Sequence, residues 1–144
     1  MTIKPLEEKD LNTVSFLMKE AFKSEPWKES WDCKACYTRL KTLFNIETST
    51  SYCLIENNKI CGLAIGFVLP FENIKEYTLM EFFIDTSLKG KHLGQSFLNL
   101  VIEELKKQDI KKIHFYTSGT LDKFYSKSGF KKVDDEYLME LDFD

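Results

Sequence analysis

The sequence lacks any apolar run that approaches the ~20 residues needed to cross a bilayer. The segment after Met1 also lacks the apolar stretch of a signal peptide, so a cytoplasmic location is expected. The net charge of −3 is too close to neutral to favour nucleic acid or an anionic membrane as a partner. What the chain does have is 43% hydrophobic and 30% charged residues over a length of 144. These values predict one domain spanning residues 1–144 with a substantial core.

Cysteine and histidine are also sparse, with four and two residues respectively. Cys33 and Cys36 have the spacing of half a zinc site or of a redox pair. A structural zinc site usually needs a second close pair, whereas Cys53 and Cys61 lie well apart in strand-like sequence. Neither histidine completes a recognisable spacing. We therefore predict reduced cysteines that act as small apolar groups, and no metal.

The pattern of apolar residues predicts an α/β fold without repeats or interdomain linkers. Helical spacing follows Asp10, Ser30 and His92, and strand-like segments surround Asn57-Asn58, whose residues suit a turn. Gly62 and Gly66 lie inside a predicted strand, where glycine often marks a bulge or a close approach. The predicted strands are 2–5, 51–56, 60–69, 76–84, 112–117, 130–133 and 137–142, and the last two predicted helices are 92–107 and Leu121–Ser126. This order predicts a mixed, mostly antiparallel sheet of six to seven strands flanked by about four helices.

A glycine-framed turn precedes the helix at 92–107. The strand before it ends in Phe82-Phe83-Ile84, and Gly90 and Gly94 frame the entry to the helix. The first turn of a helix has backbone N–H groups without internal partners and carries partial positive charge, and Lys89 and Lys91 add to it. This arrangement fits a pyrophosphate, but it also fits an ordinary turn on a solvated surface. The patterns of a P-loop and of a Rossmann site both fit poorly.

Two motifs resemble the GCN5-related N-acetyltransferase (GNAT) superfamily. The stretch Lys89-Gly90-Lys91-His92-Leu93-Gly94 resembles its Arg/Gln-x-x-Gly-x-Gly/Ala motif. Lys89 stands where Arg or Gln is usual, and His92 stands where the middle glycine is usual. Phe124-Tyr125-Ser126-Lys127-Ser128-Gly129-Phe130 resembles its Phe/Leu-Tyr-x-x-x-Gly-Phe segment. Because the order of elements matches over the whole chain, it is identified as a small bacterial-type member with the GNAT fold.

This resemblance implies an acetyl-CoA-dependent N-acetyltransferase that acts directly on a primary amine of a small molecule, such as a cationic or aminoglycoside-like acceptor. Acetylation of a protein lysine or N-terminus, or a catalytically silent acetyl-CoA-binding module, remain open as alternatives. Family members are often homodimers, and neither nucleic acid nor membrane is an implied partner. The implied coenzyme A contacts are Phe82, Phe83, Ile84, Lys89, Gly90, Lys91, His92, Leu93, Gly94 and Gln95.

The resemblance also suggests the catalytic groups. Tyr125 matches the family's tyrosine acid, although a tyrosine pKa near ~10 lies above a thiol pKa near ~8.5, so held geometry must assist protonation of the leaving thiolate. The base stays open between Glu76 and Glu81. In an unbroken strand these two residues would face opposite sides of the sheet. A bulge is usual in this strand of the family and shifts the alternation, so both residues could face the same side. The predicted walls of the acceptor site are Trp27, Trp31, Phe71 and Tyr77. The alternative for Trp27 and Trp31 is that they pack the junction of the first two predicted helices.

Overall fold

The computed structural model describes residues 1–88 and 90–143. Its helices and strands alternate in the order that the sequence predicts, up to the last helix. The strands are β1 (Thr2–Pro5), β2 (Ser49–Glu56), β3 (Lys59–Phe71), β4 (Ile74–Ile84) and β5 (Lys112–His114). The helices are α1 (Leu11–Lys23), α2 (Cys33–Phe44), α3 (Leu93–Lys107) and α4 (Asp122–Ser126).

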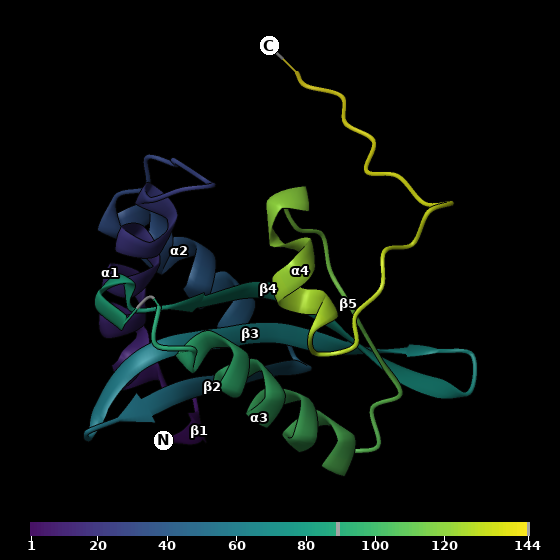
Figure 1. Ribbon diagram of the computed structural model, residues 1–144, viewed down its shortest axis with the longest axis horizontal. Coiled ribbons are helices and arrows are strands. Elements are labelled where there is room, and N and C mark those ends of the chain that lie inside the picture. The colour runs from purple at the N-terminus through teal and green to yellow at the C-terminus, as the bar shows by residue number, and fades with distance from the viewer. Residues whose placement is uncertain (89, 144) are drawn as a thin grey trace.

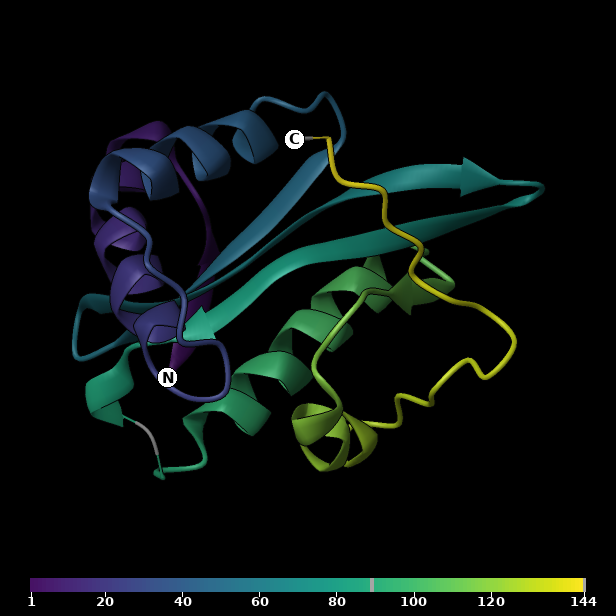
Figure 2. The ribbon, with the colours of Figure 1, turned by 90° about the horizontal axis from the view of Figure 1, so that it is seen from above.

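The strands form one sheet in the order β1-β2-β3-β4-β5 (Figure 1). Neighbouring strands are antiparallel except β4 and β5, which α3 connects as a parallel crossover. Helices α1 and α2 cover one face of the sheet, and α3 covers the other (Figure 2). This mixed architecture confirms the predicted α/β class.

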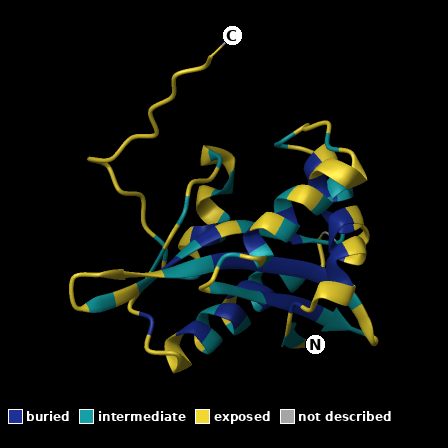
Figure 3. Cartoon of the chain, turned by 180° about the vertical axis from the view of Figure 1, so that it is seen from behind, coloured by how far each residue is buried: buried dark blue, intermediate teal, exposed yellow. Residues whose placement is uncertain are grey.

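Each face of the sheet has its own apolar core. Figure 3 shows buried stretches along the sheet and on the helices that cover it. Between the sheet and helices α1 and α2, the buried residues include Leu11, Met18, Leu40, Leu63 and Phe83. Between the sheet and α3, they include Leu54, Ala64, Tyr77, Leu79 and Phe97. All four cysteines are free, and Cys36, Cys53 and Cys61 are buried as small apolar groups.

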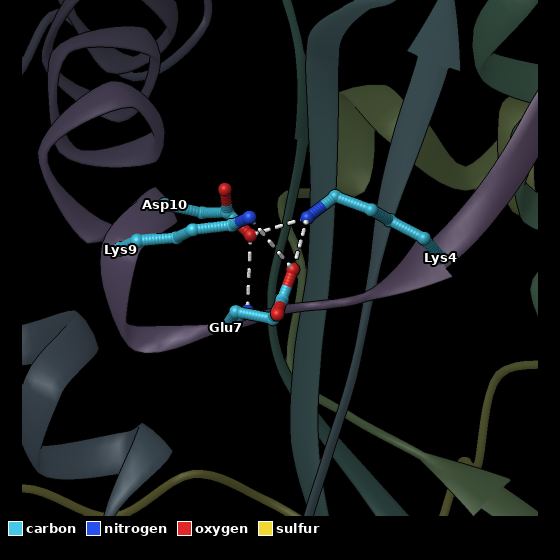
Figure 4. Close-up of polar contacts among 4 residues, drawn as sticks. All are labelled: Lys4, Glu7, Lys9 and Asp10. Atoms are coloured by element: carbon cyan, nitrogen blue, oxygen red, sulfur yellow. Dashed lines mark hydrogen bonds and ion pairs between the residues drawn. The ribbon is translucent and has the colours of Figure 1, made fainter.

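A cluster of charges ties β1 to the start of α1 (Figure 4). Lys4 Nζ lies 2.5 Å from Asp10 Oδ2 and 3.2 Å from Glu7 Oε2, and Lys9 Nζ lies 3.7 Å from the same Glu7 oxygen. The Glu7 N–H donates to Asp10 Oδ2 at 3.0 Å. Burial acts to raise the pKa of Asp10, but these hydrogen bonds bring it below its ordinary value. The cluster therefore fixes α1 against the first strand.

A β-bulge in β4 determines which side chains face which helices. Ile65 pairs with Glu81 whereas Gly66 pairs with Leu79, so Met80 is an extra residue in β4. Before the bulge, Tyr77 and Leu79 face α3; after it, Phe83 packs under α1 and α2. The bulge that the family resemblance implies is confirmed, and it turns the side chain of Glu81 toward α2.

Gly66 is required at this bulge because the strands approach too closely there for a side chain. A Cβ at this position would lie 2.0 Å from the Thr78 carbonyl oxygen. We expect Gly66→Ala to lower the free energy of unfolding by about 1–3 kcal/mol or more, measured by urea denaturation. Gly119→Ala is the matched control, since a Cβ there meets nothing within 4 Å. Equal losses in the two variants would show that the close approach is unimportant.

The C-terminal segment departs from the prediction. The predicted strand 112–117 is paired only over Lys112–His114, and residues 130–133 and 137–142 are not strands. Residues 131–143 extend away from the body and are exposed throughout (Figures 1 and 3). Their alternating pattern is that of a strand, but a strand also needs a neighbouring backbone for its hydrogen bonds. The described sheet therefore has five strands rather than six or seven.

Candidate active site

The amino terminus of α3 lies next to the end of β4 and opens on a cavity. His92 precedes the helix in the left-handed conformation, with φ of 59°, and its side chain makes no capping hydrogen bond. Gly90 also has a positive φ, of 83°. The first-turn N–H groups of Leu93, Gly94 and Gln95 have no partners within the helix, since each lacks a preceding helical carbonyl. The turn therefore presents donors and the positive end of a helix dipole.

The cavity beside this turn has a volume of about 330 Å³. Its walls come from the end of β4, the turn before α3, the first turn of α3 and α4, together with Ala21 of α1 and the predicted acceptor-site residue Trp27. The predicted cofactor residues that line it are Phe82, Phe83, Ile84, Gly90, His92, Leu93, Gly94 and Gln95. Within the described residues, β5 pairs with β4 only at Glu76–Thr78, so it leaves the edge of β4 open beyond Thr78. The cavity thus combines helix N–H groups with a strand edge that can hydrogen-bond an extended amide-bearing arm.

The Phe124–Phe130 motif holds α4 against this cavity. Tyr125 packs on Phe115 with ring centroids 4.5 Å apart, and Phe130 packs on Phe115 at 5.1 Å. Gly129, with φ of 96°, ends the helix in a turn where the N–H of Phe130 donates to the carbonyl of Tyr125. The motif therefore builds an aromatic cluster that places Tyr125 at the junction of α4, β4 and β5.

Glu81 is the buried carboxylate of the site. Its side chain is only 11% exposed, and Arg39 on α2 donates from Nε to Glu81 Oε1 at 2.5 Å. Burial raises the pKa of Glu81, while the Arg39 guanidinium acts in the opposite direction. Arg39 itself is 39% exposed and stacks at 6.0 Å over the Trp31 ring. A carboxylate with a raised pKa in a cleft has the properties of a general base.

A second, smaller cavity of about 90 Å³ contains Glu81 and adjoins the first. Four residues line both cavities: Trp27, Phe82, Leu121 and Tyr125. Burial raises the pKa of Tyr125 to about 12, against the effect of a hydrogen bond with Thr117. Tyr125 is therefore a neutral hydroxyl at all ordinary pH values. It lies between the α3 turn on one side and Glu81 on the other.

The other predicted site residues lie elsewhere. Glu76 lies near the start of β4, where it pairs with Leu69 and Lys112, outside the cavities that contain Glu81 and the α3 turn. Tyr77 is 0% exposed, and its hydroxyl donates to the Thr50 carbonyl at 2.8 Å, so it is a core residue rather than a wall of an acceptor site. Phe71 is exposed near the β3–β4 turn, and Trp31 lies on an open groove along α2.

The two lysines of the first motif are placed differently. Lys91 is exposed and does not line the cavity. Lys89 lies outside the described residues. Their roles toward a pyrophosphate stay predictions.

Two functional candidates escaped sequence reasoning. Arg39 lies 42 positions before Glu81, and only the bulge in β4 and the packing of α2 bring them together. Lys127 lines the larger cavity from the turn after α4. Lys127 could have been found, because it lies inside the second motif; no local pattern marks Arg39.

Among residues 1–88 and 90–143, no group of three or more metal-ligating side chains is gathered. None of the helices in these two ranges is long and apolar enough to cross a membrane.

The fold and the site together define a class of α/β protein with two adjoining cavities. A helix amino terminus and an open strand edge face the first cavity, and a buried carboxylate lies in the second. Comparison with protein families then identifies the family, because the model of the acetyltransferase (GNAT) domain matches residues 15–140. The chain therefore belongs to the GNAT family and is an N-acetyltransferase. Members of this family generally use acetyl-CoA.

Solved structures share the fold at low sequence identity. A possible acetyltransferase from Clostridium difficile 630 superposes with a TM-score of 0.82 at 14% identity, covering 99% of this chain and 98% of its own. A GNAT family acetyltransferase from Staphylococcus aureus has a TM-score of 0.75 at 18% identity, with 97% and 98% covered. Glucosamine-6-phosphate N-acetyltransferase from Arabidopsis thaliana superposes with a TM-score of 0.71 at 17% sequence identity, and the superposition covers 98% of each chain. A comparison with curated proteins finds no match.

Proposed function

We propose that this chain transfers the acetyl group of acetyl-CoA directly to a primary amine of a small molecule. The observation that carries the proposal is the pair of adjoining cavities, one with the amino terminus of α3 and the other with Glu81. Tyr125 and Phe82 line both. A donor held at α3 and an amine held beside Glu81 would therefore meet next to the Tyr125 hydroxyl.

The residues present fit coenzyme A. The N–H groups of Leu93, Gly94 and Gln95 would hold the pyrophosphate, with Lys127 adding positive charge to the cavity wall. The open edge of β4 after the bulge would hydrogen-bond the amides of the pantetheine arm, as an added strand does. When bound, acetyl-CoA supplies an activated thioester. Fixing it on a helix and a strand restricts the geometry of attack, which is a large part of the catalytic effect.

Glu81 would accept the proton of the attacking amine. The nearby Arg39 guanidinium keeps the carboxylate ionised in a buried place where burial alone would favour its protonated form. Tyr125 would donate its O–H to the leaving sulfur and would stabilise the thiolate without full proton transfer, because its own pKa is about 12. Glu76 has no comparable place beside the cavities, and we favour Glu81 as the base.

The acceptor would occupy the Glu81 cavity, whose small volume and aromatic lining suit a small amine rather than a peptide chain. Glu81 is the acidic residue among those that line this cavity, and Arg39 neutralises it, so the cavity lining itself has no excess negative charge for a polycation. Arg39 also lines the open groove along α2, so an amine that carries a carboxylate or phosphate would find a partner there.

A thiol-release assay tests the proposal with aminoglycosides, polyamines, amino acids, amino sugar phosphates and peptides as acceptors. We expect turnover with small amines, and most with those that carry an anionic group. Turnover with peptides alone would overturn the small-molecule proposal in favour of protein acetylation. Binding of coenzyme A without turnover on any amine would instead indicate a catalytically silent module.

Gly94 tests the cofactor site separately. A Cβ at Gly94 would lie 3.4 Å from the Phe124 ring, so the branched side chain of Gly94→Val has to project into the cavity or displace α4. We expect the Kd for coenzyme A, measured by calorimetry, to rise about 10- to 100-fold, or by ~1.4–2.7 kcal/mol. Gly119→Val is the matched control, since a Cβ there contacts nothing within 4 Å. Unchanged affinity in Gly94→Val would exclude this cavity as the binding place.

A further inference from the structure

The ion pair between Arg39 and Glu81 lies at the boundary of two spaces. Glu81 on β4 lines the cavity of about 90 Å³ beside Tyr125, whereas Arg39 on α2 lines the open groove of about 630 Å³ along that helix. Arg39 Nε donates to Glu81 Oε1 at 2.5 Å, so the two side chains touch where the cavity and the groove approach each other. A molecule that extends from the cavity into the groove therefore has to pass along this ion pair.

The ion pair leaves part of each group unused. Within residues 1–88 and 90–143, the contact between Arg39 Nε and Glu81 Oε1 is the only hydrogen bond of either side chain. A guanidinium has five N–H donors and a carboxylate has two oxygens that accept hydrogen bonds. The two Nη groups of Arg39 and the Oε2 atom of Glu81 are therefore left for a ligand.

The Arg39 guanidinium is held in place on a second side. It lies 6.0 Å over the Trp31 ring, and Trp31 Nε1 donates to Glu29 Oε1 at 2.7 Å. Asp32, which also lines the groove, accepts the N–H of Ala35 at 2.7 Å, so its carboxylate caps α2. Arg39 thus presents a planar fork whose orientation is set before a ligand binds, and this fork matches a carboxylate.

A fixed pair of opposite charges favours a ligand that carries the reverse pair. An ammonium group would bind Glu81 Oε2, and an anionic oxygen would bind the Arg39 Nη groups. Because Arg39 and Glu81 are in direct contact, the places for the two ligand groups are close together. A short zwitterion that lies antiparallel to the ion pair satisfies both places, whereas a simple amine leaves the Arg39 fork without its partner.

We propose that the acetyl acceptor is an amino acid whose amine and carboxylate are attached to the same carbon or to neighbouring carbons, and that Arg39 is the specificity-determining residue that binds the carboxylate. This inference rests on the proposed function and names the class of its amine. One proton of the ammonium goes to Glu81, and the nitrogen bonds to the acetyl carbon as the carbon–sulfur bond breaks. The electron pair of that bond stays on sulfur, and the second proton of the nitrogen is lost to solvent.

Comparing each common amino acid with its own amide tests the role of Arg39, because the amide keeps the amine and the side chain but lacks the anion. In the wild type, kcat/KM for the preferred amino acid should exceed that for its amide about 10- to 100-fold, the effect of a hydrogen bond between charged groups. Arg39→Gln should remove most of this ratio. Any effect of Arg39 on Glu81 acts on both acceptors and cancels in the ratio, as in a double-mutant cycle.

Two further variants complete the comparison. Arg39→Lys keeps a cation beside Glu81 but loses the fork, so it should also lower the ratio, and it keeps the test available if Arg39→Gln does not fold. Lys41→Gln is the matched control. Lys41 lies on the same helix and pairs with Glu8, outside the residues that line the groove, so its loss should leave the ratio unchanged. Circular dichroism checks the fold of each variant.

The spacing between the two charges is tested with β-alanine, γ-aminobutyrate and ε-aminocaproate, for which kcat/KM should fall in that order. An amide that reacts as well as its amino acid in the wild type, a ratio that persists in Arg39→Gln, or a preference for ε-aminocaproate would each overturn the inference. If no amine is acetylated, the proposed function fails, and calorimetry with the coenzyme A complex still decides the recognition. Amino acid binding that Arg39→Gln abolishes would support the site, and absence of binding would overturn it.

Discussion

Glu81→Gln is expected to lower kcat about 10²- to 10⁴-fold, the range that a general base contributes. Glutamine keeps the shape of the side chain but cannot accept the proton of the amine. Glu81 is the carboxylate of the cavity beside Tyr125, and it is buried and paired with Arg39. The affinity for coenzyme A should not change, because Glu81 does not line the cofactor cavity.

The pH profile separates this role from a structural one. Burial raises the pKa of Glu81, so the rate should fall on the acidic side at a higher pH than an ordinary glutamate would give, and Glu81→Gln should abolish that limb. Arg39→Gln removes the cation that lowers the pKa of Glu81, so it should move the acidic limb to higher pH without abolishing it. A limb that persists in Glu81→Gln would return the base to Glu76 or to bound water.

Glu81→Gln should keep its fold, because folding raises the pKa of Glu81. A carboxyl whose pKa is raised by folding stabilises the fold below its unfolded-state pKa, and that stabilisation is lost as pH rises through the folded-state pKa. At neutral pH the Glu81 charge is therefore a cost that Arg39 offsets in part. Glu81→Gln should leave the free energy of unfolding unchanged or raise it slightly.

The sequence predicted the elements whose pattern is local. The helical spacing behind α1 and α3 and the glycines of β3 are readable without tertiary contacts, and the structure confirms the helices, the strand and the bulge at Gly66. The motif around Tyr125 placed it on a short helix, as found. These features are set by residues close together in the chain.

What escaped the sequence depends on distant contacts. The pairing of Arg39 with Glu81 needs the bulge and the packing of α2 together. The burial of Tyr77 follows from its side of β4 before the bulge, which alternation alone could not assign. The prediction of the two C-terminal strands was wrong for another reason. Alternation in the sequence predicts which side chains suit a strand, but it does not show which neighbouring strand would supply the backbone hydrogen bonds.

Tyr125→Phe is expected to lower kcat about 10²-fold, the loss found when one hydrogen-bond donor to a developing anion is removed. Burial raises the pKa of Tyr125 to about 12, so its hydroxyl stays protonated and can donate at every pH of the assay. The loss should therefore be the same across the profile, and the acidic limb due to Glu81 should remain. Coenzyme A should bind as before, because phenylalanine keeps the ring that packs on Phe115 and Phe82.

A matched control removes a tyrosine hydroxyl elsewhere. Tyr37 packs against the core beneath α2 and lines neither cavity of the site, so Tyr37→Phe should keep the wild-type rate. Wild-type turnover in Tyr125→Phe would mean that the leaving sulfur needs no donor from α4. A loss that grows toward low pH would instead show that the substitution disturbs Glu81, since Tyr125 and Glu81 line the same cavity. The two variants together thus assign the proton of the amine and the charge of the sulfur to different residues.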